Sequence, residues 1–231
     1  MPSLSVIIPT YNEEQTLNKT VQNLLKTAKT PSELEIIVAD GGSNDKTQEI
    51  AENLPVRFHS CDRKGRTAQM NEGADLASAN ILYFLHSDTL TPQLWDDHIL
   101  NTWKKGHRAG CFQLKFSDDH PVLRFYSWFT RFQKRAFRYG DQSVFVSREF
   151  FRKSGGYLED HIVMEDNEFI WRAFQEIGFV IMNEAVITSA RRYRENGIFR
   201  LQAVFLLIYL GYFMGYSQEQ LVALHKKMLR G

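Results

Sequence analysis

Residues 4–13 read Leu4-Ser5-Val6-Ile7-Ile8-Pro9-Thr10-Tyr11-Asn12-Glu13, an apolar and largely β-branched run that ends at a proline and passes directly into polar side chains. A run of this kind is typical of a buried strand. Residues 35–40 and 81–85 repeat the pattern. Apolar residues recur at helical spacing over 17–28, and a second helix is predicted at 66–77. Strands that alternate with helices predict an α/β fold with a largely parallel sheet.

Polar loops follow three of these strands, namely Thr10-Tyr11-Asn12-Glu13, Asp40-Gly41-Gly42-Ser43 and His86-Ser87-Asp88-Thr89. The carboxyl ends of parallel strands meet at one edge of a sheet, and ligands bind at that edge. We therefore expect a site built from these three loops. Further along the chain, the pattern predicts strands at 56–59, 109–116 and 143–146, and helices from Asp45 and at 92–105, 122–137 and 166–177.

The charge balance bears on the class of partner. The 231 residues include 28 basic and 27 acidic side chains, for a net charge of +1. No global field attracts nucleic acid, so no nucleic-acid partner is expected and any charged ligand must meet a local patch. Cys61 and Cys111 lie outside any CxxC pattern, which disfavours a disulfide framework and a structural zinc site. The first residues lack a signal-peptide pattern, so we expect a cytoplasmic location.

Each polar motif has a structural interpretation beside a functional one. Asp40 and its glycines suit a tight turn, and neither GxGxxG nor GxxxxGK[ST] is present, which disfavours a glycine-loop phosphate site. Asp88 suits a turn, but it also suits Mg²⁺ or Mn²⁺, which prefer oxygen ligands and share their shell with substrate phosphates. Glu165 and Asp166 suit a helix start, and they also suit a general base that faces a pocket.

Taken together and in order, five motifs resemble those of a family 2 glycosyltransferase. They are Ser5–Glu13, Ile37–Thr47, Arg66–Ala74, His86–Asp88 and Glu165–Asp166, and the resemblance covers roughly residues 4–190. Two further motifs resemble those of a small bacterial subgroup of this family, often labelled arsenosugar-type. They are Gly140-Asp141-Gln142-Ser143 and Arg191-Arg192-Tyr193. The resemblance implies a GT-A fold with a Rossmann-like sheet, a nucleoside diphosphate sugar donor, Mg²⁺ or Mn²⁺, and inversion at the anomeric carbon.

The resemblance also implies roles for individual residues. Asp166 would be the catalytic base, with Glu165 as its neighbour and competitor, because inversion by direct displacement needs a carboxylate that deprotonates the acceptor hydroxyl. Asp88 would hold the metal, and His86 replaces the first acid of the family's metal motif and is a second metal candidate. The residues expected to bind the donor are Pro9, Tyr11, Glu13, Asp40, Gly42, Arg66, Asn71 and Ser87.

The acceptor is expected to meet Arg131, Arg135, Asp141, Gln142, Arg191 and Arg192. Two of these arginines come from a two-faced pattern in the helix predicted at 122–137. Val122, Phe125, Tyr126, Phe129, Phe132 and Ala136 share one side, whereas Arg124, Arg131, Arg135 and Arg138 share the other. This pattern is either a solvated basic face over a core stripe, or a row of arginines that recognises an anionic or lipid-phosphate-linked acceptor.

The C-terminal part, residues 196–231, is interpreted as a helical appendage to a transferase domain at 1–195. Residues 201–216 carry no charge but fall short of the ~20 apolar residues that span a bilayer. A helix packed on the domain or on a second subunit, as in a homodimer, is favoured. The alternative is an interfacial helix, peripheral on the inner membrane, where a lipid acceptor would be found.

Two other functions stay open. A nucleotidyltransferase-like nucleotide-sugar enzyme would carry a Gly-rich basic loop after the first strand, where this chain has Thr10–Glu13. A non-catalytic nucleotide-sugar-binding protein would not need Asp88 and Asp166 together. For the donor, the position of Asp40 favours a UDP-sugar, with a GDP-sugar as the alternative.

Overall fold

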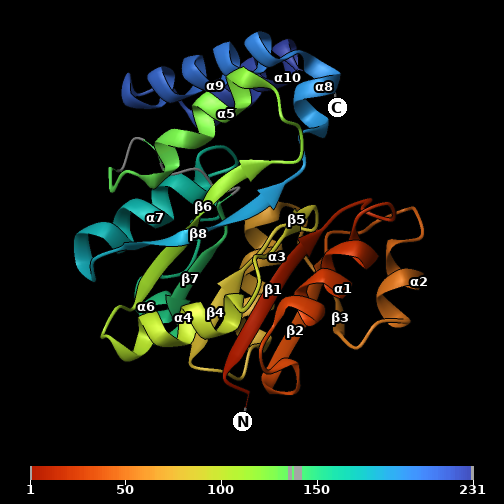
Figure 1. Ribbon diagram of the computed structural model, residues 1–231. Coiled ribbons are helices and arrows are strands. Elements are labelled where there is room, and N and C mark those ends of the chain that lie inside the picture. The colour runs from red at the N-terminus through yellow and green to blue at the C-terminus, as the bar shows by residue number, and fades with distance from the viewer. Residues whose placement is uncertain (1, 135–136, 138–141, 230–231) are drawn as a thin grey trace.

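The computed structural model describes residues 2–134, 137 and 142–229. They form a single sheet with helices on both faces (Figure 1). The strands, in their order across the sheet, are β3 (Arg57–Ser60), β2 (Leu34–Asp40), β1 (Leu4–Thr10), β4 (Ile81–Phe84), β7 (Val144–Ser147), β6 (Ala109–Phe116), β8 (Val180–Thr188) and β5 (Thr89–Leu90).

The helices are α1 (Leu17–Thr27), α2 (Thr47–Glu52), α3 (Arg66–Leu76), α4 (Trp95–Lys104), α5 (Pro121–Trp128), α6 (Arg148–Lys153), α7 (Glu165–Glu176), α8 (Arg191–Asn196), α9 (Ile198–Phe213) and α10 (Gln218–Met228). Two 3₁₀ turns, Pro31–Glu33 and Phe129–Arg131, complete the described elements.

Strand direction follows the expected pattern over most of the sheet. Strands β3, β2, β1 and β4 pair in parallel, and so do β6 and β8. Strand β7 runs antiparallel to both β4 and β6, and β5 runs antiparallel to β8, so the sheet is mixed. The predicted α/β fold with flanking helices is confirmed.

Alternation along β1 builds a core on each face of the sheet. Val6 and Ile8 pack with apolar residues of α1, α2 and α4 in one buried cluster. Ile7 points to the other face, where it joins residues of α3, α6 and α7. Because both faces are covered, the strand reads as a continuous apolar run instead of an alternating one.

The helix predicted at 122–137 is shorter than expected. Helix α5 ends at Trp128, a 3₁₀ turn follows, and Phe132 is extended. The cause is Thr130, which is buried and whose Oγ1 accepts a hydrogen bond from the Leu114 N–H at 3.0 Å, so the chain is fixed to β6. Phe125, which was expected in a core stripe, is 61% exposed, so the apolar side is not buried there. Arg135 and Arg138 lie outside the described residues.

The C-terminal helices pack on the rest of the chain along one stripe. Leu201, Val204 and Ile208 of α9 are buried in a cluster that includes Leu123 of α5. Helix α8 crosses the predicted boundary between residues 195 and 196, and that boundary stays a prediction. Among the described residues, no helix combines the length and apolar character needed to cross a bilayer.

Candidate functional site

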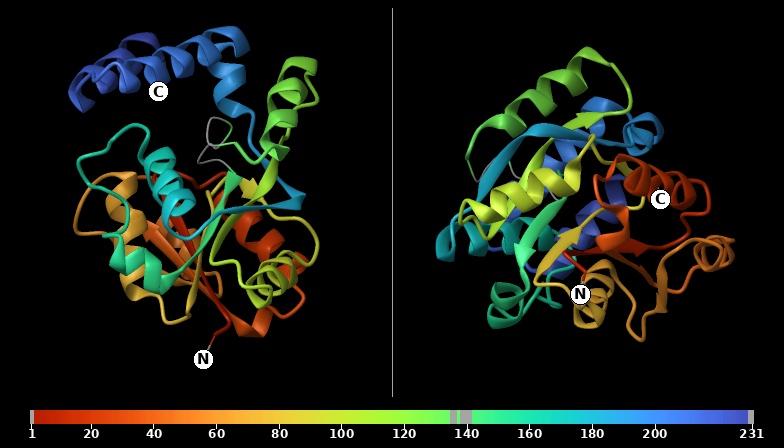
Figure 2. Two further views of the ribbon diagram at one scale, coloured as in Figure 1. Left: turned by 90° about the vertical axis from the view of Figure 1, so that its left-hand side faces the viewer. Right: turned by 60° about the horizontal axis from the view of Figure 1, so that its bottom comes forward.

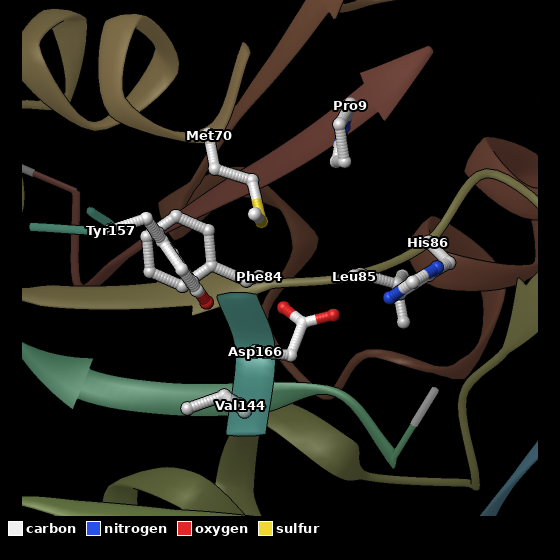
Figure 3. Close-up of a pocket in the computed structure, with 8 residues that line it drawn as sticks. All are labelled: Pro9, Met70, Phe84, Leu85, His86, Val144, Tyr157 and Asp166. Atoms are coloured by element: carbon white, nitrogen blue, oxygen red, sulfur yellow. The ribbon is translucent and has the colours of Figure 1, made fainter. Parts of the chain in front are cut away.

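The carboxyl ends of β1, β2 and β4 lie at the same edge of the sheet, as predicted (Figure 1). A small pocket opens there, and its volume of about 10 Å³ is room for one water molecule. The Asp166 carboxylate points into the space between Met70, Tyr157 and His86 (Figure 3). Burial raises the pKa of Tyr157 well above its usual value, and the charge of Asp166 acts in the same direction, so this phenol stays neutral. The full lining is Pro9, Met70, Phe84, Leu85, His86, Val144, Tyr157 and Asp166.

Asp40 organises the loop after β2. It is buried, and its carboxylate accepts hydrogen bonds from the Gly42 N–H at 2.9 Å, the Ser43 N–H at 2.8 Å and the Ser43 hydroxyl at 2.5 Å. Gly42 has φ of 89°, a conformation that favours glycine. The carboxylate is therefore engaged by its own loop, and the loop presents its backbone to the edge of the sheet.

The loop after β1 is attached to the loop after β2. The Asn44 N–H donates to Asn12 Oδ1 at 2.8 Å, and the Asn12 N–H donates to Ser43 Oγ at 2.8 Å. The Glu13 N–H donates to Thr47 Oγ1, also at 2.8 Å. These bonds hold the two loops as one unit and leave the Tyr11 side chain 56% exposed at its tip.

Gln69 supports this unit from below and was missed by the sequence analysis. The side chain is 4% exposed, and its amide donates to the Ala39 carbonyl at 3.0 Å and to the Thr10 carbonyl. It thus ties α3 to the ends of both β1 and β2. A polar residue on the buried side of the predicted helix 66–77 was the available signal.

Arg66 brings together three residues that the sequence predicted for the site. Its Nη2 donates to the Asp166 carboxylate and to His86 Nε2, the latter at 2.5 Å. Its Nη1 lies 3.6 Å from Glu165 Oε1. Both acids are 8% exposed. Opposite charges and low exposure make this cluster the strongest electrostatic feature of the pocket.

The start of α7 explains how two adjacent acids reach one guanidinium. Met164 has φ of 66°, a left-handed conformation that turns the chain directly into the helix. Glu165 and Asp166 therefore occupy the first turn, where negative charge is stabilised by the helix dipole. Their side chains diverge, and each meets a different nitrogen of Arg66.

Arg191, which is predicted to meet the acceptor, contacts Glu13, which is predicted to bind the donor. Its Nη2 donates to Glu13 Oε1 at 3.1 Å, while the Thr16 hydroxyl donates to Glu13 Oε2 at 2.5 Å. Burial lowers the pKa of Arg191, but the charges of Glu13 and Asp88 outweigh it and raise that pKa. The guanidinium is therefore bonded to Glu13 and interacts electrostatically with Asp88.

The donor set for a metal is small. Asp88 offers one carboxylate, which accepts a weak hydrogen bond from the Thr89 hydroxyl at 3.4 Å. His86 Nε2 already accepts from Arg66, so in this arrangement that atom is not open to a cation. Mg²⁺ is commonly held by one or two carboxylates plus substrate phosphates. Asp88 fits that pattern if the donor completes the shell, whereas His86 does not fit it through Nε2.

Within the described ranges, the only three-residue group of His, Cys, Asp and Glu spaced for a cation is His59, Cys61 and Glu72. His59 belongs to β3, Cys61 directly follows that strand, and Glu72 belongs to α3. Burial raises the pKa of the Cys61 thiol to about 12, and the charge of Glu72 adds to this effect. Glu72 already accepts hydrogen bonds from His59 Nε2 at 3.0 Å and from the Asp62 N–H at 3.0 Å.

Asn71 and Ser87 were predicted to bind the sugar donor, and both form hydrogen bonds within the protein. The Asn71 amide donates to the Tyr157 carbonyl at 2.8 Å and accepts from the Tyr157 N–H at 2.9 Å. Ser87 is buried, and its carbonyl accepts from the Thr20 hydroxyl at 2.7 Å. These contacts account for both residues without a bound donor, and their roles in donor binding stay predictions.

Among the described residues, the others predicted to meet the acceptor make their contacts away from Arg66 and Asp166. Gln142 is buried, and its amide donates to the Phe112 carbonyl at 3.2 Å, so it faces β6. Arg192 Nη2 lies 3.1 Å from His225 Nε2, toward α10. Arg131 is exposed, and its guanidinium lies 5.2 Å from the centre of the Trp128 ring. Arg135 and Asp141 lie outside the described residues.

Comparison with known sequences gives one family. The model described as "Glycosyl transferase family 2" matches residues 5–157. Glycosyltransferase AglE of Haloferax volcanii is 32% identical over 108 residues, which is 44% of this chain and 36% of AglE. Glycosyltransferase AglD of the same organism is 27% identical over 196 residues, which is 76% of this chain and 31% of AglD. The chain thus spans about a third of the length of these relatives.

Solved structures share the fold. TarS residues 1–349 from S. aureus, in complex with UDP, superimposes with a TM-score of 0.68 at 18% identity, over 88% of this chain and 65% of that one. The mannosyltransferase PcManGT from Pyrobaculum calidifontis, in complex with GDP-Man and Mn²⁺, gives 0.68 at 19% identity, over 90% and 62%. The GT-A fold that the resemblance implied is confirmed, and the arsenosugar-type subgroup stays a prediction.

Proposed function

Because the chain belongs to glycosyl transferase family 2, we propose that it moves a sugar from a nucleoside diphosphate sugar to an acceptor hydroxyl, with inversion at the anomeric carbon. The donor is a UDP-sugar in the first instance, with GDP-sugars as the alternative. The observation that carries the proposal is the convergence of Arg66, His86, Glu165 and Asp166 at the carboxyl edge of the sheet.

The donor half consists of the joined loops after β1 and β2. Tyr11 is exposed at the tip and offers an aromatic face to the nucleotide base. Arg191 donates to Glu13 and its charge interacts with that of Asp88. A diphosphate would replace these carboxylates as its ionic partner. Negative charge grows on the nucleoside diphosphate as it departs, and Arg191 and Arg66 are the cations placed to stabilise it.

The acceptor half centres on Asp166. A carboxylate oxygen of this residue takes the proton of the acceptor hydroxyl while the acceptor oxygen attacks the anomeric carbon. The bond from that carbon to the diphosphate oxygen breaks in the same step. Arg66 holds the carboxylate in position by donating to it, and Glu165 lies further from the guanidinium.

A divalent metal assists this chemistry. Mg²⁺ or Mn²⁺ would be held by Asp88 together with the donor phosphates. When bound, the metal supplies Lewis-acid stabilisation of the departing diphosphate. Arg191 interacts electrostatically with Asp88 and would add positive charge to this site.

For the acceptor, we propose an anionic or lipid-linked molecule that approaches from the side of α5. Arg131 is exposed there and stacks on Trp128. A guanidinium fixed on an aromatic ring suits recognition of phosphate. Replacing Arg131 with Gln should raise the acceptor KM and leave donor affinity unchanged, and an equal loss of donor affinity would contradict this assignment.

Calorimetric titration of UDP, GDP and dTDP in the presence of Mn²⁺ tests the donor proposal. Binding of at least one nucleotide is expected, and failure of all three would refute it. An assay for nucleoside diphosphate release from the matching nucleotide sugar then separates the alternatives. Binding without release indicates a non-catalytic binding protein, and release of pyrophosphate from a nucleoside triphosphate in a reaction with a sugar phosphate indicates a nucleotidyltransferase.

A further inference from the structure

Helix α9 has a second apolar stripe, on the side away from the domain. Its inner stripe is buried, as described above. The outer stripe is exposed along the whole helix, with Phe199 at 73%, Leu206 at 58% and Met214 at 71%. We call this outer stripe the α9 outer face, and it consists of Phe199, Ala203, Leu206, Leu207, Leu210 and Met214.

An exposed stripe of this length is unusual for a surface helix. Sixteen residues of α9 correspond to about 24 Å. A surface helix normally carries polar residues opposite its buried stripe, and a helix that is apolar all round is normally covered all round. Contiguous apolar surface of this kind marks an interaction site.

The position of α9 leaves this face accessible. Figure 1 and the left view of Figure 2 both show α9 along the top edge of the molecule. Helix α10 lies beside it, and the sheet lies below it. The inner stripe contacts Leu123 of α5 and Leu224 of α10. Trp171 of α7 packs against Tyr209, Tyr212 and Phe213 at the flank of α9. The side chains of the α9 outer face stay exposed beside these contacts.

The charges around α9 indicate which partner covers the face. Between Arg191 and Leu229, five basic side chains and two acidic side chains are exposed. Two copies of the chain that met through this region would bring like charges together, whereas an anionic surface would attract them. The exposed basic residues are Arg192, Arg194, Arg200, Lys226 and Lys227, and the acidic ones are Glu195 and Glu219.

We propose that the α9 outer face is a docking surface for an anionic lipid bilayer. The helix lies in the plane of the membrane, with its leucine and phenylalanine side chains among the acyl chains and the surrounding arginines and lysines at the headgroups. The length of α9 suits this orientation, since it falls short of a span. Tyr216, which is exposed just beyond α9, has the amphipathic ring that favours the headgroup level. The proposal needs no substrate and does not rest on the transferase activity.

Vesicle flotation of the intact chain tests it. The protein should float with phosphatidylcholine vesicles that contain phosphatidylglycerol and should bind pure phosphatidylcholine less. Added salt should weaken the binding because exposed charges are screened beyond about 10 Å at 0.1 M. The double variant Leu206→Gln/Leu210→Gln should lose vesicle partitioning by about tenfold or more. Both side chains are exposed, so its thermal midpoint should match the wild type. Absence of flotation, or flotation of this variant at the wild-type level, would overturn the proposal.

Two pairs of consecutive lysines provide a matched test of whether basic charge near α9 contributes to lipid binding. Lys226→Gln/Lys227→Gln removes exposed charge beside α9, whereas Lys104→Gln/Lys105→Gln removes it at the end of α4, on the opposite part of the molecule in Figure 1. The first variant should bind anionic vesicles more weakly and the second should not. Equal losses would mean attraction without a defined surface and would contradict the assignment.

Sedimentation velocity without lipid tests whether a second copy of the chain covers the α9 outer face instead. A monomer is expected. A dimer that Leu206→Gln/Leu210→Gln converts to monomer would show that a second copy covers the face, and would refute docking to a bilayer.

Discussion

Replacing Asp166 with Asn should abolish turnover while it preserves nucleotide binding. The asparagine retains an oxygen that accepts from Arg66, so the buried cluster around this guanidinium keeps its shape. What disappears is the proton acceptor, and loss of a general base costs about 10²–10⁴-fold in rate. That range corresponds to about 3–5 kcal/mol in the activation barrier. Arg66 loses one ionic partner and becomes more available to a diphosphate, so nucleotide affinity should not fall.

Glu165→Gln is the matched control because the two acids are adjacent and equally buried. Glu165 lies 3.6 Å from Arg66 Nη1, beyond hydrogen-bond distance, and neighbouring side chains on a helix diverge by about 100°. This variant should therefore lose less than tenfold in turnover, an order of magnitude below the range given for a general base. Release of nucleoside diphosphate measures the rate, and calorimetry measures the affinity.

Asp88→Ala should impair binding where Asp166→Asn impairs turnover. We expect weaker Mn²⁺-dependent nucleotide binding, because loss of a metal ligand first lowers the affinity for the metal and its nucleotide. Near wild-type turnover for Asp166→Asn, combined with loss for Glu165→Gln, would show that the base has been assigned to the wrong acid. If both variants turned over normally, direct displacement assisted by this pair would have to be abandoned.

Three further predictions concern the support of the site. Gln69→Leu should lower the free energy of unfolding in urea by about 2 kcal/mol, because the Thr10 and Ala39 carbonyls each lose one of their hydrogen-bond donors. The exposed Gln48→Leu should have little effect, and equal losses would contradict this role. Burial opposes the charge on Glu72, but hydrogen bonds from His59 and the 62–63 loop hold its pKa at about 2. Glu72→Gln should therefore lower the free energy of unfolding at pH 7 by at most about 3 kcal/mol. The difference in this free energy between variant and wild type should disappear as the pH falls from about 4.5 toward 2. A difference that does not depend on pH would refute this role of Glu72. Gly156→Ala should be more destabilising than Gly155→Ala. Both glycines have positive φ, but only at position 156 would a Cβ meet the Asn71 side chain, at 2.7 Å. Equal thermal midpoints for the two variants would contradict the clash.

The N-terminal half of the sheet was predictable because its strands are buried on both faces. Continuous apolar runs such as 4–8 and 81–85 then stand out against the polar loops that follow them. The same loops marked the edge where the pocket lies. The acids at 165–166 were recognised by their place in a family pattern, and Arg66 by its motif.

Strand β8, residues Val180–Thr188, escaped prediction for a physical reason. Asn183 and Glu184 interrupt its apolar pattern, and only three of its nine residues are buried. The strand pairs with β6 through an irregular register between Cys111 and Gln113, and with the short β5. A half-covered strand with polar positions carries little periodic signal.

Long-range contacts account for the other differences. The aromatic period of 122–137 favours a continuous helix, but the Thr130 contact to Leu114 fixes the chain to β6 and ends it. Arg191 comes near Glu13, 178 positions away in the sequence, because α8 follows β8 back to the site edge. Neither contact has a local signature in the residues that make it.

The most direct test is to identify the products formed from a panel of UDP- and GDP-sugars with Mn²⁺ by nuclear magnetic resonance at early times. The account predicts release of the nucleoside diphosphate, together with a sugar product of inverted anomeric configuration. Release with retained configuration would contradict direct displacement at Asp166. Turnover of no sugar nucleotide by a chain that binds the free nucleotides would contradict glycosyl transfer itself.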